Sequence, residues 1–134
     1  MTDPLEFEPI PFLSGKHQQT IFGSLFNFAK EPSSETLFVK LPDGDVMASE
    51  VSTPEQWKPS DPTVFMLHGL CGSHQSPYLI RMTTKLLERG VRCVRMNMRG
   101  CGSGKGLAKG FYHCGSSDDI FAIIADQRKK FPLS

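Results

Sequence analysis

Residues 63–78 read TVFMLHGLCGSHQSPY and join a short apolar run to a loop of small residues. The run, residues 64–67, is too short for a helix and is bounded by turn-forming residues, which is typical of a strand buried on both faces of a mostly parallel sheet. Glycines in the loop allow sharp turns, and Pro77 suits the first position of a helix. Such a strand, loop and helix N-terminus can together hold a negative charge that develops during a reaction.

The segments before this stretch predict a helix and a hairpin. Apolar residues in 14–28 recur at helical spacing, which favours a short amphipathic helix over the domain. Two β-rich runs follow at 35–41 and 46–51, separated by Pro42-Asp43-Gly44-Asp45. An Asp-Gly turn between such runs is a strong hairpin signal.

The segments after it predict a crossover unit and a last helix. Apolar residues in 77–89 recur at helical spacing until Gly90, and residues 91–98 alternate as in a strand. A strand, a helix and a second parallel strand form a right-handed crossover. Residues 116–131 carry acidic residues in the first turn and basic residues in the last, which favours a helix. One face of this helix is predicted to carry Ile120, Ile124, Gln127 and Phe131, with Phe121 and Ile123 beside it.

Seven short motifs occur in one order along the chain: HQQT at 17–20, LPDGD at 41–45, HGL at 68–70, GS at 72–73, SPY at 76–78, MRGC at 98–101 and YHCG at 112–115. This ordered set resembles the YheT and EMB8-like branch of the α/β-hydrolases, which is related to animal abhydrolase proteins with lipase or esterase activity. The resemblance extends from roughly Phe12 to Phe131. It implies an α/β fold, the N-terminal half of an α/β-hydrolase sheet, in which an antiparallel hairpin precedes parallel strands with crossover helices.

The resemblance also implies roles for the HGL loop. The backbone N–H of Leu70 is expected to donate to the oxyanion, with Gly69 setting the geometry of this oxyanion hole. His68, Gly72 and Ser73 are expected to support the loop. The second oxyanion donor would be the residue after a nucleophilic serine.

The catalytic triad is expected to be absent. An α/β-hydrolase carries its nucleophile in a Gly-x-Ser-x-Gly turn, followed along the chain by an acid and then a histidine. No such pentapeptide occurs, and the histidines at 68, 74 and 113 precede the place where the nucleophile would lie. The same motif is missing around every serine considered: Ser73, Ser76, Ser103, Ser116 and Ser117. We therefore expect a partial domain at 35–134, ending before the nucleophile and inactive alone, preceded by an N-terminal arm and short helix at 1–34.

Other site classes are less favoured by the spacing. Cys71, His74, His113 and Cys114 could supply zinc ligands, but the last two are adjacent and neighbours rarely converge on one ion. The glycine-rich segment 99–110 fits neither a Walker loop nor a dinucleotide fingerprint. We expect no metal and no cofactor, and interpret Arg99 as a structural clamp that donates to loop carbonyls.

Composition is that of an ordinary globular domain. The 134 residues are 39% hydrophobic and 22% charged, with a net charge of +1, which gives no reason to expect a nucleic-acid partner. No apolar run approaches the length of a membrane span, and the acidic N-terminus lacks a signal core. We expect a cytoplasmic location and free thiols.

Two functions remain open, besides the disfavoured zinc module. The first is part of a carboxylic ester hydrolase that uses a serine acyl-enzyme, with a small-molecule or lipid ester as substrate. The second is a non-catalytic fragment or binding module that associates through an open sheet edge, with self-association as one outcome.

Overall fold

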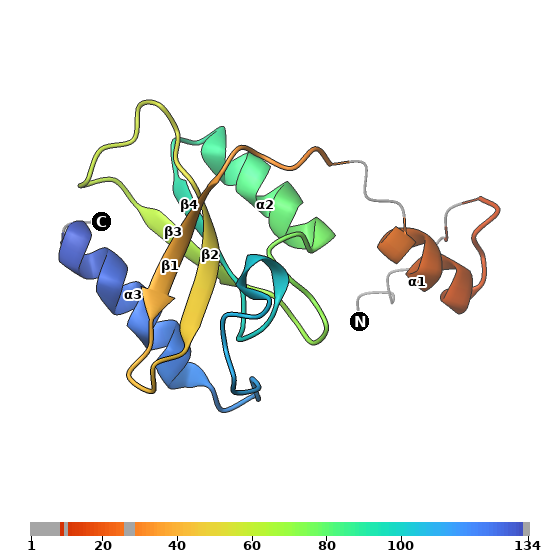
Figure 1. The fold of residues 1–134 in the computed structure, drawn as a ribbon. Coiled ribbons are helices and arrows are strands. Elements are labelled where there is room, and N and C mark those ends of the chain that lie inside the picture. The colour runs from red at the N-terminus through yellow and green to blue at the C-terminus, as the bar shows by residue number, and fades with distance from the viewer. Residues whose placement is uncertain (1–8, 10, 26–28, 133–134) are drawn as a thin grey trace, which may run out of the picture.

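The computed structural model describes residues 9, 11–25 and 29–132. Within them the chain forms a mixed four-stranded sheet with helices on both faces (Figure 1). The elements, in chain order, are α1 (Lys16–Leu25), β1 (Glu35–Lys40), β2 (Val46–Ser52), β3 (Thr63–Leu67), α2 (Pro77–Leu87), β4 (Arg92–Met96), the 3-10 turn η1 (Gly102–Gly104) and α3 (Ser117–Lys130). The α/β fold class predicted from the sequence is confirmed.

The predicted hairpin is present. β1 and β2 pair antiparallel, with Glu35 opposite Val51 and Lys40 opposite Val46. Gly44 adopts a φ of +93° in the turn, a left-handed conformation that glycine reaches without the steric cost of a Cβ. The Leu41 N–H donates to the Asp45 carbonyl at 2.8 Å and closes the turn.

The predicted crossover unit is also present. β3 and β4 pair in parallel from Thr63 opposite Arg92 to Leu67 opposite Met96, and α2 forms the connection between them. Gly90 follows α2 with a φ of +75° and turns the chain into β4. β2 pairs with β4 antiparallel, so the strand order is β1-β2-β4-β3.

The expectation that β3 is buried on both faces is wrong. All five residues of β3 are only half-buried, whereas all five residues of β4 are buried. The strand order explains the difference, because β4 lies between two strands while β3 is at the edge of the described sheet. The apolar run indicated a strand, but the run alone could not tell an edge strand from a central one.

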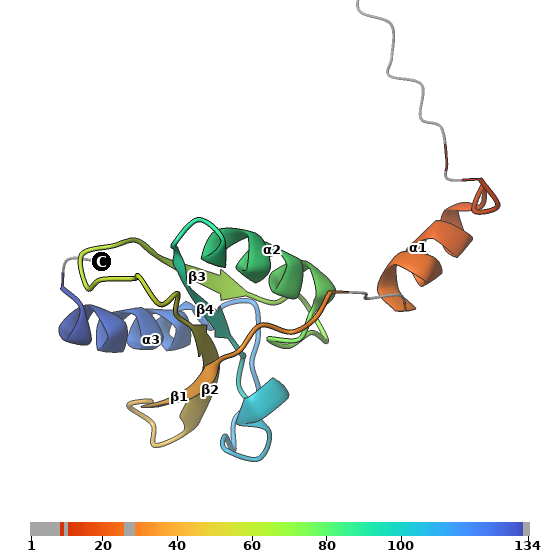
Figure 2. The same ribbon diagram turned by 90° about the horizontal axis from the view of Figure 1, so that it is seen from above.

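The two faces of the sheet are covered by different helices, as the view from above shows (Figure 2). Val94 and Met96 of β4 join a core cluster that includes Ile123 of α3. The alternate residues of β4 face α2, which packs against this strand. On α3, Ile123 and Gln127 are buried and Ile120 is partly buried. Gln127 and Ile120 confirm the predicted face, whereas Ile123, expected beside that face, is more buried than Ile124.

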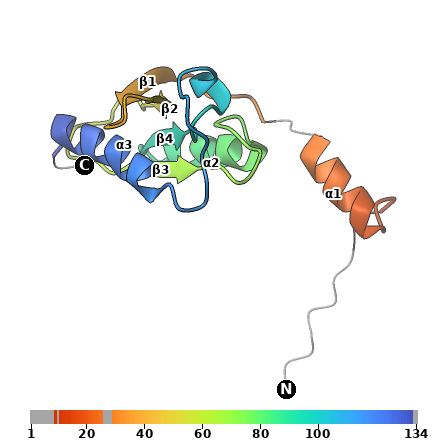
Figure 3. The same ribbon diagram turned by 60° about the horizontal axis from the view of Figure 1, so that its bottom comes forward.

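The helix α1 does not lie over the domain as expected. It stands apart from the sheet in all three views (Figure 3), and Ile21 is 56% exposed. The helices that pack on the described sheet are instead α2 and α3, one on each side of it. The predicted helical residues 26–28, and the irregular segment at residues 1–8 and 10, lie outside the described residues.

Among the described helices, none is long and apolar enough to cross a membrane.

Candidate functional site

The loop after β3 is held by two tyrosine hydroxyls. The Gly69 N–H donates to Tyr78 Oη at 2.9 Å, and the Cys71 N–H donates to Tyr112 Oη at 3.3 Å. Tyr78 comes from the first turn of α2, while Tyr112 comes from the segment that leads into α3. Two elements far apart in sequence therefore bind the residues on either side of Leu70.

His68 fixes the peptide that follows it. Its ring is buried, and Nε2 accepts the Met98 N–H at 3.1 Å. The proton must then be on Nδ1, which donates to the Gly69 carbonyl at 2.8 Å. The same carbonyl accepts the Gly72 N–H at 3.0 Å. His68 therefore accepts one hydrogen bond and donates another within the protein, so both of its ring nitrogens are occupied.

These bonds orient the Leu70 N–H. In a trans peptide the carbonyl of Gly69 and the N–H of Leu70 point in opposite directions. Since the carbonyl points toward His68 and Gly72, the N–H points away from them. Within the described part of the chain this N–H has no hydrogen-bond partner, and the Leu70 side chain is 85% exposed. The arrangement leaves one oriented donor free between two that are occupied.

The backbone beside Leu70 is strained. Cys71 has a φ of +57°, a conformation that costs a non-glycine residue roughly 1–2 kcal/mol. Gly72 is packed so closely that a Cβ there would lie 2.8 Å from Ser76 Oγ. The Ser73 N–H donates to the same Ser76 oxygen at 3.2 Å, which closes the loop against the start of α2. Strain of this kind is common in ligand-binding and catalytic loops.

Asn97 anchors the far side of the loop to β4. Its side-chain oxygen accepts the His74 N–H at 2.8 Å, and its side-chain nitrogen donates to Ser103 Oγ at 3.0 Å. Both Asn97 and His74 are buried. This connection was not predicted from the sequence, because the partners are separated by 23 residues and no short-range pattern links them.

Arg99 binds three carboxylates, two from the hairpin turn and one from α3. It forms a bidentate pair with Asp119 at 2.7 Å and also contacts Asp43 and Asp45. These contacts hold the pKa of Arg99 above its ordinary value. Arg99 is a structural clamp as predicted, but its partners are carboxylates and not the loop carbonyls that we expected. It joins the hairpin turn to the first turn of α3.

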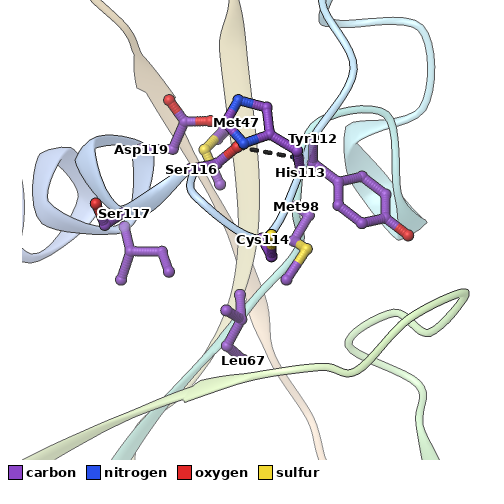
Figure 4. Close-up of a pocket in the computed structure, with 10 residues that line it drawn as sticks. Met47, Leu67, Met98, Tyr112, His113, Cys114, Ser116, Ser117 and Asp119 are labelled. Atoms are coloured by element: carbon purple, nitrogen blue, oxygen red, sulfur yellow. Dashed lines mark hydrogen bonds between the residues drawn. The ribbon is translucent and has the colours of Figure 1, made fainter.

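An apolar cavity of about 100 Å³ lies beside Tyr112 (Figure 4). Leu67, Met98 and Cys114 point into the same space in this view, and Met47 and Ile120 complete its apolar wall. The Tyr112 ring meets His68 edge-on, with 6.4 Å between the ring centroids. Tyr112 therefore borders the cavity with its ring and holds the Leu70 loop with its hydroxyl.

The serines near this site are not activated by a histidine. Ser116 Oγ accepts the backbone N–H of His113 at 3.1 Å, and the His113 ring accepts the Gly115 N–H instead. Ser73, Ser76 and Ser103 likewise bond only backbone or non-histidine groups in the contacts observed among the described residues. In the part of the chain that the structure describes, these contacts do not pair any of the four serines with a histidine base, as acyl transfer would need.

The residues weighed as zinc ligands do not assemble. Cys71 and Cys114 are exposed thiols, whereas the His74 ring is buried and lies 3.1 Å from the Asn97 side chain. In the described residues, no three His, Cys, Asp or Glu side chains are grouped as a metal ion would need.

Comparison with known proteins identifies the fold family. No family model matches the chain. YheT of Escherichia coli (strain K12), a candidate esterase, is 31% identical over 126 residues, which are 94% of this chain and 37% of that protein. An α/β serine hydrolase of Xanthomonas campestris, XC6422, superimposes with a TM-score of 0.62 at 28% identity, over 80% of this chain and 49% of its own.

The chain belongs to the α/β-hydrolase superfamily. The embryogenesis-associated protein EMB8 of Picea glauca is a second relative, 24% identical over 96% of this chain and 30% of its own length. The resemblance to this branch, expected from the ordered motifs, is confirmed. This α/β-hydrolase chain spans about a third of the length of these two curated relatives.

Proposed function

We propose that this chain supplies the oxyanion-binding half of a carboxylic ester hydrolase that works through a serine acyl-enzyme. The observation that carries the proposal is the Leu70 N–H, which has no partner among the described residues while Tyr78 and Tyr112 occupy the N–H groups on either side. Support also comes from relatives named as esterases. Residues 35–134 would form the catalytic-domain portion, with 1–34 as an arm.

The chemistry follows from where charge develops. When a serine attacks an ester carbonyl, the carbonyl oxygen becomes an oxyanion, and a donor aimed at that position lowers the barrier. Leu70 supplies one such donor, while Gly69, His68, Gly72 and Ser73 hold its peptide in place. The nucleophile, its base, the acid and the second donor would come from outside the described residues.

The cavity beside Tyr112 suggests which part of the substrate binds here. Its wall is mostly apolar, and its volume of about 100 Å³ is small. We infer that it takes the first carbons of an acyl chain. A mouse relative named as a phospholipase, ABHD3, is 31% identical over 53% of this chain and supports a lipid-like ester as one substrate class. The free thiols agree with action in a reducing compartment such as the cytoplasm.

The proposal predicts that Leu70→Pro and Leu70→Ala differ in how well they bind an oxyanion. Proline removes the N–H, whereas alanine keeps it and removes only an exposed side chain. In the ¹⁵N-labelled chain, titration with methylphosphonate, a tetrahedral oxyanion, should shift the Leu70 amide resonance more than those of Gly69 and Cys71. Leu70→Ala should retain binding and Leu70→Pro should lose it.

A second readout concerns catalysis. Where this segment is joined to a nucleophilic serine in a longer polypeptide, Leu70→Pro should lower kcat about 10²- to 10³-fold, with a small effect from Leu70→Ala. The 134-residue chain itself should neither hydrolyse p-nitrophenyl butyrate nor react with a fluorophosphonate. A labelled serine in the chain, or equal anion binding by both Leu70 variants, would overturn the proposal.

A second candidate function is association through the edge of β3. In the described sheet β3 has a neighbour on one side only, and its residues are half-buried. Such an edge presents unpaired backbone groups that can pair with another strand. The strand order therefore favours pairing of β3 with a strand of a second copy of this chain or of another protein.

Sedimentation equilibrium between 5 and 200 µM should then show a concentration-dependent dimer. Val64→Lys, on β3, should raise the dimer dissociation constant at least tenfold, because a charge on an edge strand opposes pairing. Phe38→Lys is the matched control, since Phe38 is 58% exposed on β1 at the other edge. A wild-type monomer throughout this range would exclude the second candidate.

A further inference from the structure

At the opposite end of the parallel pair from the Leu70 loop, a buried arginine packs against two aromatic rings. Arg92 is the first residue of β4 and is 6% exposed. Its guanidinium carbon lies 5.1 Å from the centre of the Trp57 ring and 4.8 Å from that of Phe131. The two rings also contact each other edge-on at 5.1 Å. They provide a favourable but uncharged environment for the cation.

The hydrogen-bond partners observed for Arg92 are neutral as well. Nη2 donates to Gln127 Oε1 at 2.7 Å, and Nε donates to Thr53 Oγ1 at 3.3 Å. Nη1 is buried without a partner. Among the described residues no carboxylate forms an ion pair with Arg92, although Glu35 is near enough to act on it electrostatically. Burial lowers the pKa of Arg92, as expected for a cation without a counter-ion.

This arginine borders a cavity of about 290 Å³. The wall combines Trp57, Phe131 and aliphatic side chains with the hydroxyls of Thr36 and Thr53. Its charged residues are Arg92, Lys130 and Glu35, so the positive charges outnumber the negative one. Lys130 also pairs with Asp126, at 2.9 Å, on the exposed surface of α3. The cation that lacks a counter-ion is therefore the buried one.

We propose that this cavity binds a small carboxylate with a compact apolar body. The guanidinium fork matches a carboxylate, and a buried cation with only neutral partners is stabilised by an incoming anion. The aromatic and aliphatic wall suits an apolar body, and the volume is at the lower end of the range for ligand sites. The site is separate from the Leu70 loop and independent of the proposed ester hydrolysis.

The rings make binding observable. Nη1 has no appreciable surface open to water, so a carboxylate can reach it only if a neighbouring group moves. Trp57 lies in the connection between β2 and β3, where its indole N–H donates to the Pro62 carbonyl at 3.3 Å. It is the only tryptophan in the sequence, so its emission reports this cavity alone.

The test is a fluorescence titration of the 134-residue chain with cyclohexanecarboxylate, excited at 295 nm. The neutral cyclohexanecarboxamide and sodium chloride at equal ionic strength are the ligand controls. We expect a saturable change in Trp57 emission with the carboxylate only. Arg92→Met should weaken binding at least tenfold, whereas Arg128→Met, an exposed arginine outside the cavity, should bind as the wild type does.

Three outcomes would overturn the inference. They are the absence of a saturable response in the wild type, an equal response to the carboxamide or to chloride, and unchanged binding by Arg92→Met. If Arg92→Met does not fold, the decision rests on the wild type, whose Tm should rise with cyclohexanecarboxylate and not with the carboxamide, because a ligand of the native state stabilises it.

Discussion

At the scale of single residues, Asp45 shows how the hairpin turn is tied to the rest of the chain. It accepts the backbone N–H groups of Lys109 and Gly110, each at 3.0 Å, and also pairs with Arg99. The two backbone donors, followed by Arg99, hold the pKa of Asp45 below its ordinary value of 3.8. Arg99 likewise lowers the pKa of Asp43. These carboxylates therefore favour the folded state when ionised.

The sign of the resulting pH dependence is fixed. A carboxyl whose pKa is lower in the folded state stabilises it above the unfolded pKa, and this contribution is lost as pH falls through the folded pKa. The contribution of these carboxylates to the free energy of unfolding should thus be constant near neutral pH and be lost below about pH 4. Urea unfolding of Asp45→Asn should show lower stability at pH 7 and a smaller loss on acidification.

Glu55→Gln is the matched control for this prediction, because Glu55 is an exposed carboxylate in the connection before β3. It should keep the wild-type pH dependence. If Asp45→Asn loses as much stability between pH 6 and pH 2.5 as the wild type does, the clamp does not act through this carboxylate.

The sequence predicted a structural role for Arg99 and an oxyanion role for the Leu70 loop, but it could not predict the partners. Asp43 and Asp119 lie 56 and 20 residues from Arg99. The hydrogen bonds that the hydroxyls of Tyr78 and Tyr112 accept could not be predicted either, because a tyrosine hydroxyl can lie at any sequence distance from the backbone N–H that donates to it. Both tyrosines occur in the SPY and YHCG motifs, which were the only signal for them.

At the scale of elements, η1 shows a close approach between a turn and the loop after β3. A Cβ at Gly102, where φ is +51°, would lie 2.3 Å from Asn97 Oδ1 and 2.6 Å from the His74 ring. Asn97 is fully buried and bonded on both sides, so it cannot move aside easily. The turn therefore needs glycine for two independent reasons, conformation and space.

Gly102→Ala should accordingly destabilise the chain more than Gly106→Ala. Gly106 has a φ of +80° but open space around it, so alanine there should cost about 1–2 kcal/mol of unfolding free energy through backbone strain alone. Gly102→Ala should cost a further 1–3 kcal/mol or so through overpacking. Urea unfolding of the two variants provides the comparison, and equal losses would show that Asn97 and His74 relax freely.

Elements were easier to predict than their burial. The hairpin, the crossover unit and α3 follow from local patterns, because turn residues and apolar periodicity act within a few residues. The edge position of β3 and the separation of α1 from the sheet depend on which other elements reach the same face. No local pattern contains that information.

At the scale of the whole molecule, the four cysteines are buried to different degrees. Cys93, on the central strand, is completely buried, and burial raises the pKa of its thiol to about 11. Cys71 and Cys114 are exposed. Because the thiolate is the reactive form, Cys93 should react only when the sheet opens.

Iodoacetamide at pH 8, followed by mass spectrometry of peptides, should label Cys71 and Cys114 quickly and Cys93 last. Partly exposed Cys101 should react at an intermediate rate, because burial also raises the pKa of that thiol. Urea should accelerate Cys93 most, while Cys93→Ala should lack the slow phase. A single fast rate for all four thiols would contradict a closed sheet.

The pairing of β2 with β4 has a consequence for how the chain is synthesised. β2 is complete at Ser52, but the strand that covers its inner edge begins only at Arg92. While the ribosome adds residues 53–91, the nascent hairpin exposes an edge that is later enclosed by the sheet. The segment translated next is polar and contains Pro54, Pro59 and Pro62, which disfavour strand pairing. Cotranslational aggregation should therefore be most sensitive to substitutions in this connection, although it contributes little to the native core.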